Sequence, residues 1–147
     1  MGPAQSAALE LRLDDIVSEL RAGASTEGLM LAACSAHDPD PRLQVRVIRA
    51  LLEHGASIAE TDKNGVTPLH RAARFRNASA VELLLAEGAD VSAVEKRSGA
   101  TALHRALMTT GAPTTAGRDD DVRRIVELLE AGADPKARNK SGKTPLD

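Results

Sequence analysis

Apolar residues recur at a helical spacing in four segments of the 147-residue chain. In each segment they follow the i, i+3, i+4 pattern that places side chains on one face of a helix. These positions are Leu9, Leu13, Ile16, Val17 and Leu20, then Ile48, Leu51 and Leu52, then Val81, Leu84 and Leu85, and finally Ile125, Leu128 and Leu129. A Gly-Ala pair follows each segment, at Gly23, Gly55, Gly88 and Gly132. Because glycine readily adopts the left-handed conformation that ends helices, the pattern predicts four amphipathic helices with glycine stops.

A second motif predicts a different, recurring helix start. Residues 65–73 read Gly-Val-Thr-Pro-Leu-His-Arg-Ala-Ala, and 34 residues later 99–107 read Gly-Ala-Thr-Ala-Leu-His-Arg-Ala-Leu. A third copy, Gly-Lys-Thr-Pro-Leu-Asp, ends the sequence before it can complete a helix. The threonine hydroxyl can cap the helix by accepting a backbone N–H, and proline at the first helical position gives up no hydrogen bond. The small alanines let another helix approach closely.

The two motifs alternate, and together they resemble a known repeat. Residues 62–73, with the threonine–proline start, and 81–91, with the leucine stripe and Gly-Ala stop, are similar to a complete ankyrin repeat. The resemblance extends over about residues 9–147 and implies an all-α solenoid of antiparallel helix pairs joined by short extended turns. The domain organisation we expect is a disordered N-terminus (1–8), a half-cap (9–24), a degenerate repeat (25–56), a regular repeat (57–89), a repeat with an insertion between its helices (90–133) and a truncated repeat (134–147).

Composition narrows the class of protein without identifying its role. Hydrophobic residues make up 42% of the chain but aromatic residues only 1%, so the core must consist of Leu, Val, Ile and Ala. The net charge of −2 gives no general reason to expect nucleic-acid or membrane binding. Cys34 is the single cysteine, so an intrachain disulfide is excluded. We expect Cys34 to be a small buried residue of the core instead of a reactive thiol. No apolar run is long enough to span a membrane, and the N-terminus does not resemble a signal peptide. We therefore expect a soluble, reducing, cytoplasmic location.

The residues that invite a catalytic or metal-binding interpretation have structural explanations. The resemblance implies that His70 and His104 hydrogen-bond the threonine hydroxyl and the neighbouring repeat. His37, Asp38 and Asp40 share a proline-containing loop that lacks the glycine and the number of oxygens of a calcium loop. The acidic run 119–121 suits the positive N-terminus of a helix. We therefore predict no enzyme activity, no catalytic residues, no cofactor and no metal.

Charge is distributed unevenly along the repeats. Turn and first-helix segments (59–77, 93–109 and 135–147) carry a net positive charge, whereas second-helix segments (78–90 and 118–134) are net negative. Ordinary solvated charge explains this distribution as well as a binding surface does. Toward the N-terminus the contrast weakens, because the arginines of 42–49 lie on a second helix.

The resemblance implies that turns and first helices line the concave face that binds partners. We therefore predict a protein–protein interaction module, monomeric by itself, for a partner that presents an acidic surface. Phe75, the lone aromatic, is a candidate hot spot, or alternatively packs over the small core. The alternatives are a regulatory or spacer ankyrin segment of a larger protein, or weak binding of nucleic acid or another polyanion. The predicted contact residues are Lys63, Asn64, Val66, Arg74, Phe75, Lys96, Arg97, Ala100, Met108 and Lys140.

Overall fold

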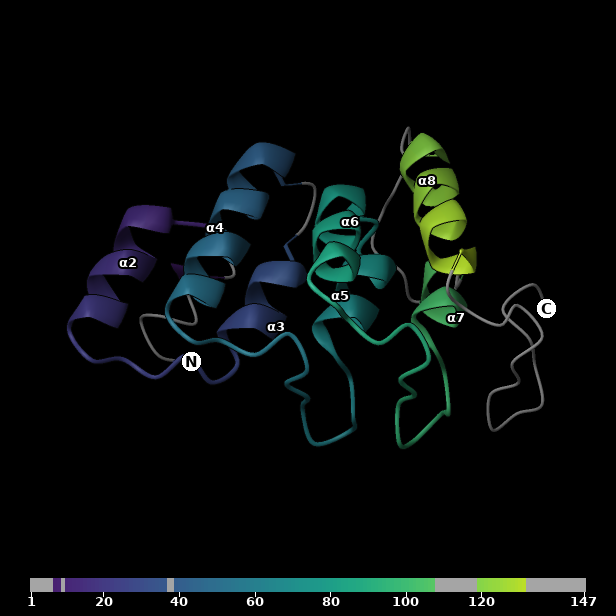
Figure 1. The fold of residues 1–147 in the computed structure, drawn as a ribbon, viewed down its shortest axis with the longest axis horizontal. Helices are drawn as coiled ribbons and strands as arrows, with labels where there is room; N and C mark the ends of the chain where they lie inside the picture. Colours follow the sequence, from purple (N-terminus) through teal and green to yellow (C-terminus); the bar gives the residue numbers. More distant parts are fainter. Residues whose placement is uncertain (1–6, 9, 37–38, 108–118, 132–147) are drawn as a thin grey trace.

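A computed structural model describes residues 7–8, 10–36, 39–107 and 119–131. Within these ranges the chain is helical and has no strand, which confirms the all-α solenoid. The helices α2, α4, α6 and α8 lie side by side along one edge, and α3, α5 and α7 lie beneath them (Figure 1). Their bounds are α2 Leu13–Arg21, α3 Leu29–Cys34, α4 Pro41–Glu53, α5 Pro68–Arg74, α6 Ala78–Ala86, α7 Ala102–Leu107 and α8 Asp119–Glu130.

Three helix pairs, α3–α4, α5–α6 and α7–α8, fall within the predicted repeats 25–56, 57–89 and 90–133. The repeat boundaries themselves stay predictions. The extended turns before α5 and α7 project together on the side of α3, α5 and α7 (Figure 1). We call the turns 57–66 and 90–100, together with α3, α5 and α7, the turn face. Among the described residues, no helix combines the length and apolar character needed to cross a membrane.

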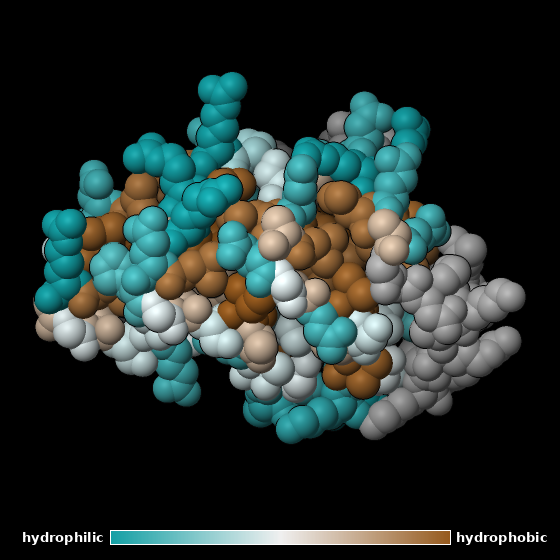
Figure 2. All heavy atoms as spheres, viewed as in Figure 1, coloured by the Kyte–Doolittle hydropathy of each residue, from teal (hydrophilic) through white to brown (hydrophobic). Residues whose placement is uncertain are grey.

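A continuous aliphatic core lies between the two rows of helices. Its alanines, such as Ala72, Ala73 and Ala80, have no exposed surface and allow close helix approach. Cys34 is also fully buried, as the sequence predicts, and burial together with the charge of Glu60 raises the pKa of its thiol. Hydrophobic residues form a band in Figure 2, between hydrophilic upper and lower margins. The largest fully buried aliphatic side chains are Ile16, Leu29, Met30, Ile48, Leu51, Leu69, Leu84, Leu103, Ile125 and Leu129.

The predicted glycine stops end the second helices with a common geometry. After α4, the N–H of Gly55 donates to the carbonyl of Leu52 at 3.1 Å, and that of Ala56 donates to Leu51 at 2.9 Å. The same pair of bonds follows α2 and α6, and all three glycines have positive φ. This arrangement satisfies carbonyls that the helix leaves without partners, and glycine adopts it without strain from a Cβ.

Two non-glycine residues adopt the same left-handed conformation, and one of them corrects the sequence interpretation. Arg76 (φ 62°) ends α5 and Leu11 (φ 56°) ends a preceding helical turn, each two residues before the next helix begins. The predicted helix over 9–20 is therefore wrong, because the chain turns at Leu11 and α2 begins at Leu13. Apolar spacing continued across that turn, and it concealed the break.

Residues 7 and 8 differ from the predicted disordered N-terminus of 1–8. Ala7 and Ala8 are helical, and 1% and 0% of their surfaces are exposed. Their carbonyls accept the backbone bonds that close the turn at Leu11. Small methyl groups fit against the core there, so a stretch that looks small and polar in the sequence is partly packed. Residues 1–6 lie outside the described residues.

Thr67 caps α5, and His70 connects this helix to the next repeat. The threonine hydroxyl accepts from the His70 N–H at 3.2 Å and donates to Nδ1 at 2.7 Å. Because Nδ1 also accepts the Thr67 N–H, the ring proton resides on Nε2, which donates to the carbonyl of Ala100 at 2.9 Å. The structural role implied for His70 is thus confirmed. Thr101 and His104 repeat the threonine–histidine part of this arrangement.

Glu60 replaces the threonine cap that the degenerate repeat lacks. Helix α3 begins after Gly28, and its side-chain cap comes from the following turn. The Glu60 carboxylate accepts from the N–H groups of Gly28 at 3.2 Å and Leu31 at 3.0 Å. A carboxylate at a helix N-terminus satisfies unpaired donors and complements the helix dipole. One residue thereby stabilises α3 and joins two repeats.

We predict that Glu60→Ala lowers the free energy of unfolding by about 1–2 kcal/mol, since two backbone donors lose their charged acceptor. Urea denaturation followed by circular dichroism measures the loss. Glu27→Ala, at an exposed glutamate in the loop before α3, is the matched control. Equal losses for the two variants would contradict the capping role.

His70 also predicts a pH dependence of stability. Burial, aided by the positive charge of Arg105, outweighs the hydrogen bonds and the negative charge of Glu95 and lowers the pKa of His70 below its usual value of 6.5. In the unfolded chain the imidazole binds its proton more readily, so the contribution of His70 is complete above about pH 6.5 and falls as the pH drops toward the lower folded-state pKa. The stability advantage of the wild type over His70→Gln should therefore shrink between pH 7.5 and pH 5, as measured by urea denaturation. Parallel pH profiles would contradict this assignment, and His54→Gln, at an exposed histidine, is the control.

Candidate partner-binding groove

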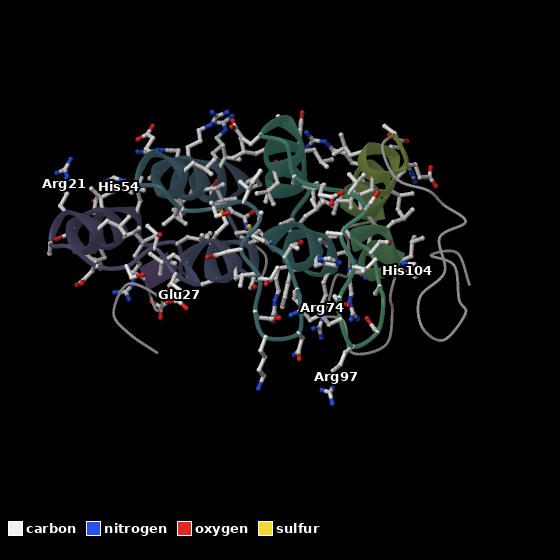
Figure 3. The ribbon with its side chains drawn as sticks, turned by 60° about the horizontal axis from the view of Figure 1, so that its bottom comes forward. Arg21, Glu27, His54, Arg74, Arg97 and His104 are labelled. Atoms are coloured by element: carbon white, nitrogen blue, oxygen red, sulfur yellow. The ribbon has the colours of Figure 1, made fainter. Side chains whose placement is uncertain are left out.

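A groove of about 310 Å³ opens on the turn face between the two described repeats of regular form. Helices α5 and α7 and the turns that precede them supply its walls. Arg74 and Arg97 lie on this side of the molecule, away from Arg21 and His54 (Figure 3). The residues that line the groove are Asp62, Asn64, Val66, His70, Arg71, Arg74, Glu95, Arg97, Ser98 and Arg105.

Asp62 shapes the first turn and fixes an arginine of the groove. Its Oδ1 accepts the N–H groups of Asn64 at 2.8 Å and Val66 at 3.1 Å. Its Oδ2 accepts from Nη2 of Arg71 at 3.3 Å. Burial by itself raises the pKa of Asp62, but the two backbone bonds and the Arg71 guanidinium outweigh it and lower the pKa below 3.8. The carboxylate is therefore charged at neutral pH.

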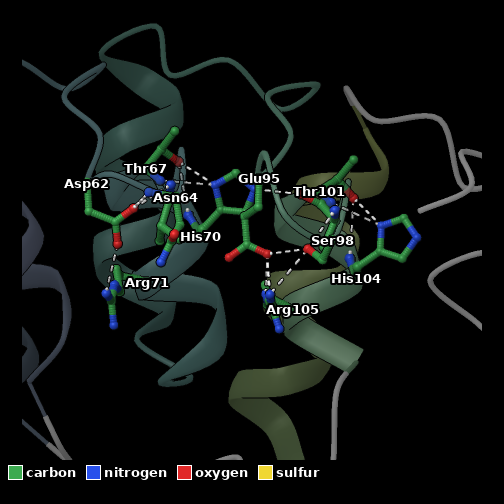
Figure 4. Close-up of polar contacts among 12 residues, drawn as sticks. Asp62, Asn64, Thr67, His70, Arg71, Glu95, Ser98, Thr101, His104 and Arg105 are labelled. Atoms are coloured by element: carbon green, nitrogen blue, oxygen red, sulfur yellow. Dashed lines mark hydrogen bonds and ion pairs between the residues drawn. The ribbon is translucent and has the colours of Figure 1, made fainter. Parts of the chain in front are cut away.

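Glu95 and Arg105 repeat this arrangement in the next turn (Figure 4). Glu95 is 5% exposed, and its Oε2 accepts from Nε of Arg105 at 2.7 Å and from the Ser98 hydroxyl at 2.9 Å. Nη2 of Arg105 also pairs with this oxygen. The second turn is one residue longer than the first. Glutamate has a longer side chain than aspartate, so its carboxylate still reaches the arginine of its own repeat. Both turns thus hold a guanidinium on an internal carboxylate.

The two turns are joined directly by their backbones. The Lys96 N–H donates to the carbonyl of Asn64 at 2.8 Å. Gly65 lies at this contact with φ 78°, and a Cβ there would approach Lys96 N and Cγ to 3.1 Å. Glycine is therefore required both by its backbone conformation and by the approach of the second turn.

Arg76 is buried, so it does not contribute the exposed positive charge that the sequence suggested for this segment. It is 4% exposed, and its guanidinium donates to the carbonyls of Ala73 and Arg105, each at 3.2 Å. A cation at the C-terminal ends of α5 and α7 complements both helix dipoles. Arg76 therefore connects two helices instead of contributing to a basic surface, and the carboxylate partners of Arg71 and Arg105 compensate their charges.

The structure brings four of the ten predicted contact residues together in the groove: Asn64, Val66, Arg74 and Arg97. Lys63 and Lys96 are exposed in the turns beside it. Ala100 is a correction, because it is 3% exposed and its carbonyl accepts from His70 and Glu95. Met108 and Lys140 lie outside the described residues.

Phe75 differs from the exposed aromatic that the sequence suggested. It is the C-terminal cap residue of α5 and is half-buried. The Arg74 guanidinium lies 5.7 Å from the centroid of its ring, within the range of a cation–π contact. Phe75 is not itself part of the groove lining, but it contacts Arg74, which is.

Sequence reasoning missed the paired residues that organise the groove. Asp62 and Glu95 lie at equivalent positions of the two turns, and Arg71 and Arg105 each follow the histidine of the helix-start motif. Aligning the two copies shows an acidic residue and an arginine at matching positions, and this was an available signal. Summing charges over each segment concealed it, because the pairs cancel.

The metal interpretation of the loop before α4 gains no support. Asp40 caps α4, with Oδ1 accepting from Arg42 N–H at 3.0 Å, and Pro41 occupies the first helical position. His37 and Asp38 lie outside the described residues. Across the part of the chain that the structure describes, no three His, Cys, Asp or Glu side chains are grouped to hold a metal ion.

A larger groove of about 710 Å³ lies elsewhere, between α2 and α4. Its lining includes three exposed arginines, Arg21, Arg46 and Arg49, beside Asp14 and Glu53. This groove therefore has one more arginine than carboxylates, in line with the weaker charge contrast seen there in the sequence.

Comparison with known proteins identifies the family. The profile described as ankyrin repeats (3 copies) matches residues 6–95 and, in an overlapping match, residues 29–116. The chain belongs to the ankyrin repeat family. Ankyrin repeats generally mediate protein–protein interactions, and the family is typically non-enzymatic.

Individual relatives share only this portion of their sequence. The chain is similar to Protein PhlB of Serratia liquefaciens (38% identity, 67% of this chain and 39% of that protein). It is also similar to the mitochondrial disaggregase of Bos taurus (33% identity, 70% and 19%) and to Rabankyrin-5 of Mus musculus (31% identity, 68% and 9%). The matched region spans well under half of each of these relatives.

The contact between the turns predicts different costs for two glycine substitutions. Gly65 and Gly88 both have positive φ, but nothing lies within 4 Å of a Cβ at Gly88. Gly88→Ala should lower the free energy of unfolding by about 1 kcal/mol through left-handed strain, and Gly65→Ala by about 1–2 kcal/mol more. Urea denaturation of both variants measures the difference. Equal losses would show that Lys96 moves aside without cost.

Proposed function

We propose that the turn face of this ankyrin repeat protein binds a partner protein through an acidic surface of that partner. The carrying observation is the groove, in which four arginines face only two carboxylates. Arg71 and Arg105 pair with Asp62 and Glu95, and the lining as a whole has two more arginines than carboxylates. A groove with an excess of one charge favours partners of the opposite charge and speeds their encounter.

The contact set that we propose follows from exposure and position. Arg97 and Lys63 are exposed at the turns, and Arg74 lies on the groove wall with Phe75 against it. Aromatic and arginine side chains are enriched among residues that dominate binding energies. Ala100 is omitted because it is buried, and Met108 and Lys140 stay predictions. The proposed set is Lys63, Asn64, Val66, Arg74, Phe75, Lys96 and Arg97.

A second candidate is a regulatory or spacer role within a larger polypeptide. The observation in its favour is that the matched regions are 39% of Protein PhlB and 9% of Rabankyrin-5. In such a protein the ankyrin repeats would recruit or position a partner for other domains. The same turn face would carry the contact, so both candidates share one test of the binding surface.

We predict that Arg97→Glu weakens partner binding, because it removes one positive charge and adds a negative charge at the groove. Proteins from the source cell are captured on the wild type and on each variant, and the proteins that Arg97→Glu loses are purified. Binding kinetics at several salt concentrations should then show slower association and a flatter salt dependence for Arg97→Glu. Phe75→Ala should increase dissociation of the same partner.

Arg46→Glu is the matched control, since it makes the same charge change at an exposed arginine of α4. A partner that is lost with Arg46→Glu and retained with Arg97→Glu would move the binding surface to the groove between α2 and α4. Binding that falls steeply with salt for nucleic acid and other polyanions alike would instead favour the polyanion alternative.

A further inference from the structure

Arg71 and Arg105 form a repeated feature of the groove. Each follows the histidine of its repeat and pairs with the carboxylate within the preceding turn. Their side chains retain 30% and 22% of their exposure, and both line the groove. A side chain that is already fixed loses little conformational freedom when a ligand binds, so these two guanidinium groups are preorganised.

The spacing of these groups is set by helix packing. Helices α5 and α7 pack directly on one another, and packed helices lie about 8–10 Å apart. We therefore expect equivalent side chains of the two helices to repeat at about the same distance. Within the described residues this series has two members, because the preceding repeat has Ala32 at the position of Arg71.

Only some peptide conformations match this spacing. A polyproline II chain has three residues per turn and advances about 9 Å per turn, so residues i and i+3 lie on one side at the required distance. Along a β-strand, residues on one face recur at about 7 and 13 Å. In an α-helix the nearest residues on one face, three or four positions apart, lie only about 5–6 Å from one another.

We propose that the groove binds an extended, polyproline II-like segment carrying two carboxylates three residues apart, one for Arg71 and one for Arg105. The excess of arginines over carboxylates in the groove lining attracts the segment. The inference rests on the proposed function: it adds Arg71 and Arg105 to the proposed contact set and specifies the conformation and spacing of the acidic partner sequence.

Fluorescence anisotropy with labelled peptides tests the spacing. The series is Glu-Pro-Glu, Glu-Pro-Pro-Glu and Glu-Pro-Pro-Pro-Glu in identical flanking sequence, with Gln-Pro-Pro-Gln as the uncharged control. Prolines hold all four in the extended conformation. We expect Glu-Pro-Pro-Glu to bind about fivefold more tightly than the other two acidic peptides, which is the contribution of one additional exposed ion pair.

Two further measurements distinguish the effect of the carboxylate spacing from that of the overall charge of the peptide. Arg71→Lys keeps the charge but loses the fixed planar geometry, so it should abolish the spacing preference, while the exposed control Arg46→Lys preserves it. In the wild type, Glu-Pro-Pro-Glu should shift the NMR resonances of the Arg71 and Arg105 side-chain nitrogens, which requires no variant to fold.

The outcomes distinguish this inference from the proposed function. Equal affinity for all three acidic peptides, still weakened by Arg97→Glu, overturns the spacing and leaves the acidic-partner proposal in place. If no acidic peptide binds more tightly than Gln-Pro-Pro-Gln, both the spacing and the acidic character of the partner are overturned.

Discussion

The hydrogen bond from His70 to the carbonyl of Ala100 is the interaction on which the regular repeats depend. A single helix pair cannot bury its apolar face, so each repeat is stable only against its neighbour. Aliphatic contacts supply most of that stability but are not directional. The histidine adds direction, because its other nitrogen is held by Thr67 at the helix start. Capping of one helix and docking of the next repeat thus depend on one neutral side chain.

The groove is a consequence of this docking. With α5 and α7 in register, their turns come close enough for the backbone bond between Lys96 and Asn64. The arginines that follow the two histidines then face the same space. Arg76 fixes the opposite ends of both helices through their carbonyls. The proposed binding surface is therefore supported on two sides by the bonds that assemble the solenoid, and a ligand would meet it largely preformed.

Sequence patterns predicted elements best where local chemistry decides them. The threonine cap of α5 and the glycine stops after α2, α4 and α6 depend on residues within one turn. The break at Leu11 was missed because a leucine in left-handed geometry carries no signal in the apolar spacing. The cap on α3 was also missed, since Glu60 lies 32 residues from Gly28. The four paired charges of the groove lining, Asp62, Arg71, Glu95 and Arg105, escaped prediction because they cancel in a sum over each segment.

By itself, the sequence determined the helical class, the repeat and the residue types of the core. Periodicity and capping depend on residues that are close in the sequence, so the sequence alone is enough to predict them. Only the tertiary structure decided which charges face solvent, since Arg76 turns inward to helix carbonyls while Arg97 stays exposed. It also decided that Ala100, predicted as a contact, is buried at the joint. Exposure and pairing depend on which repeat packs against which surface, and that is settled when the helices stack.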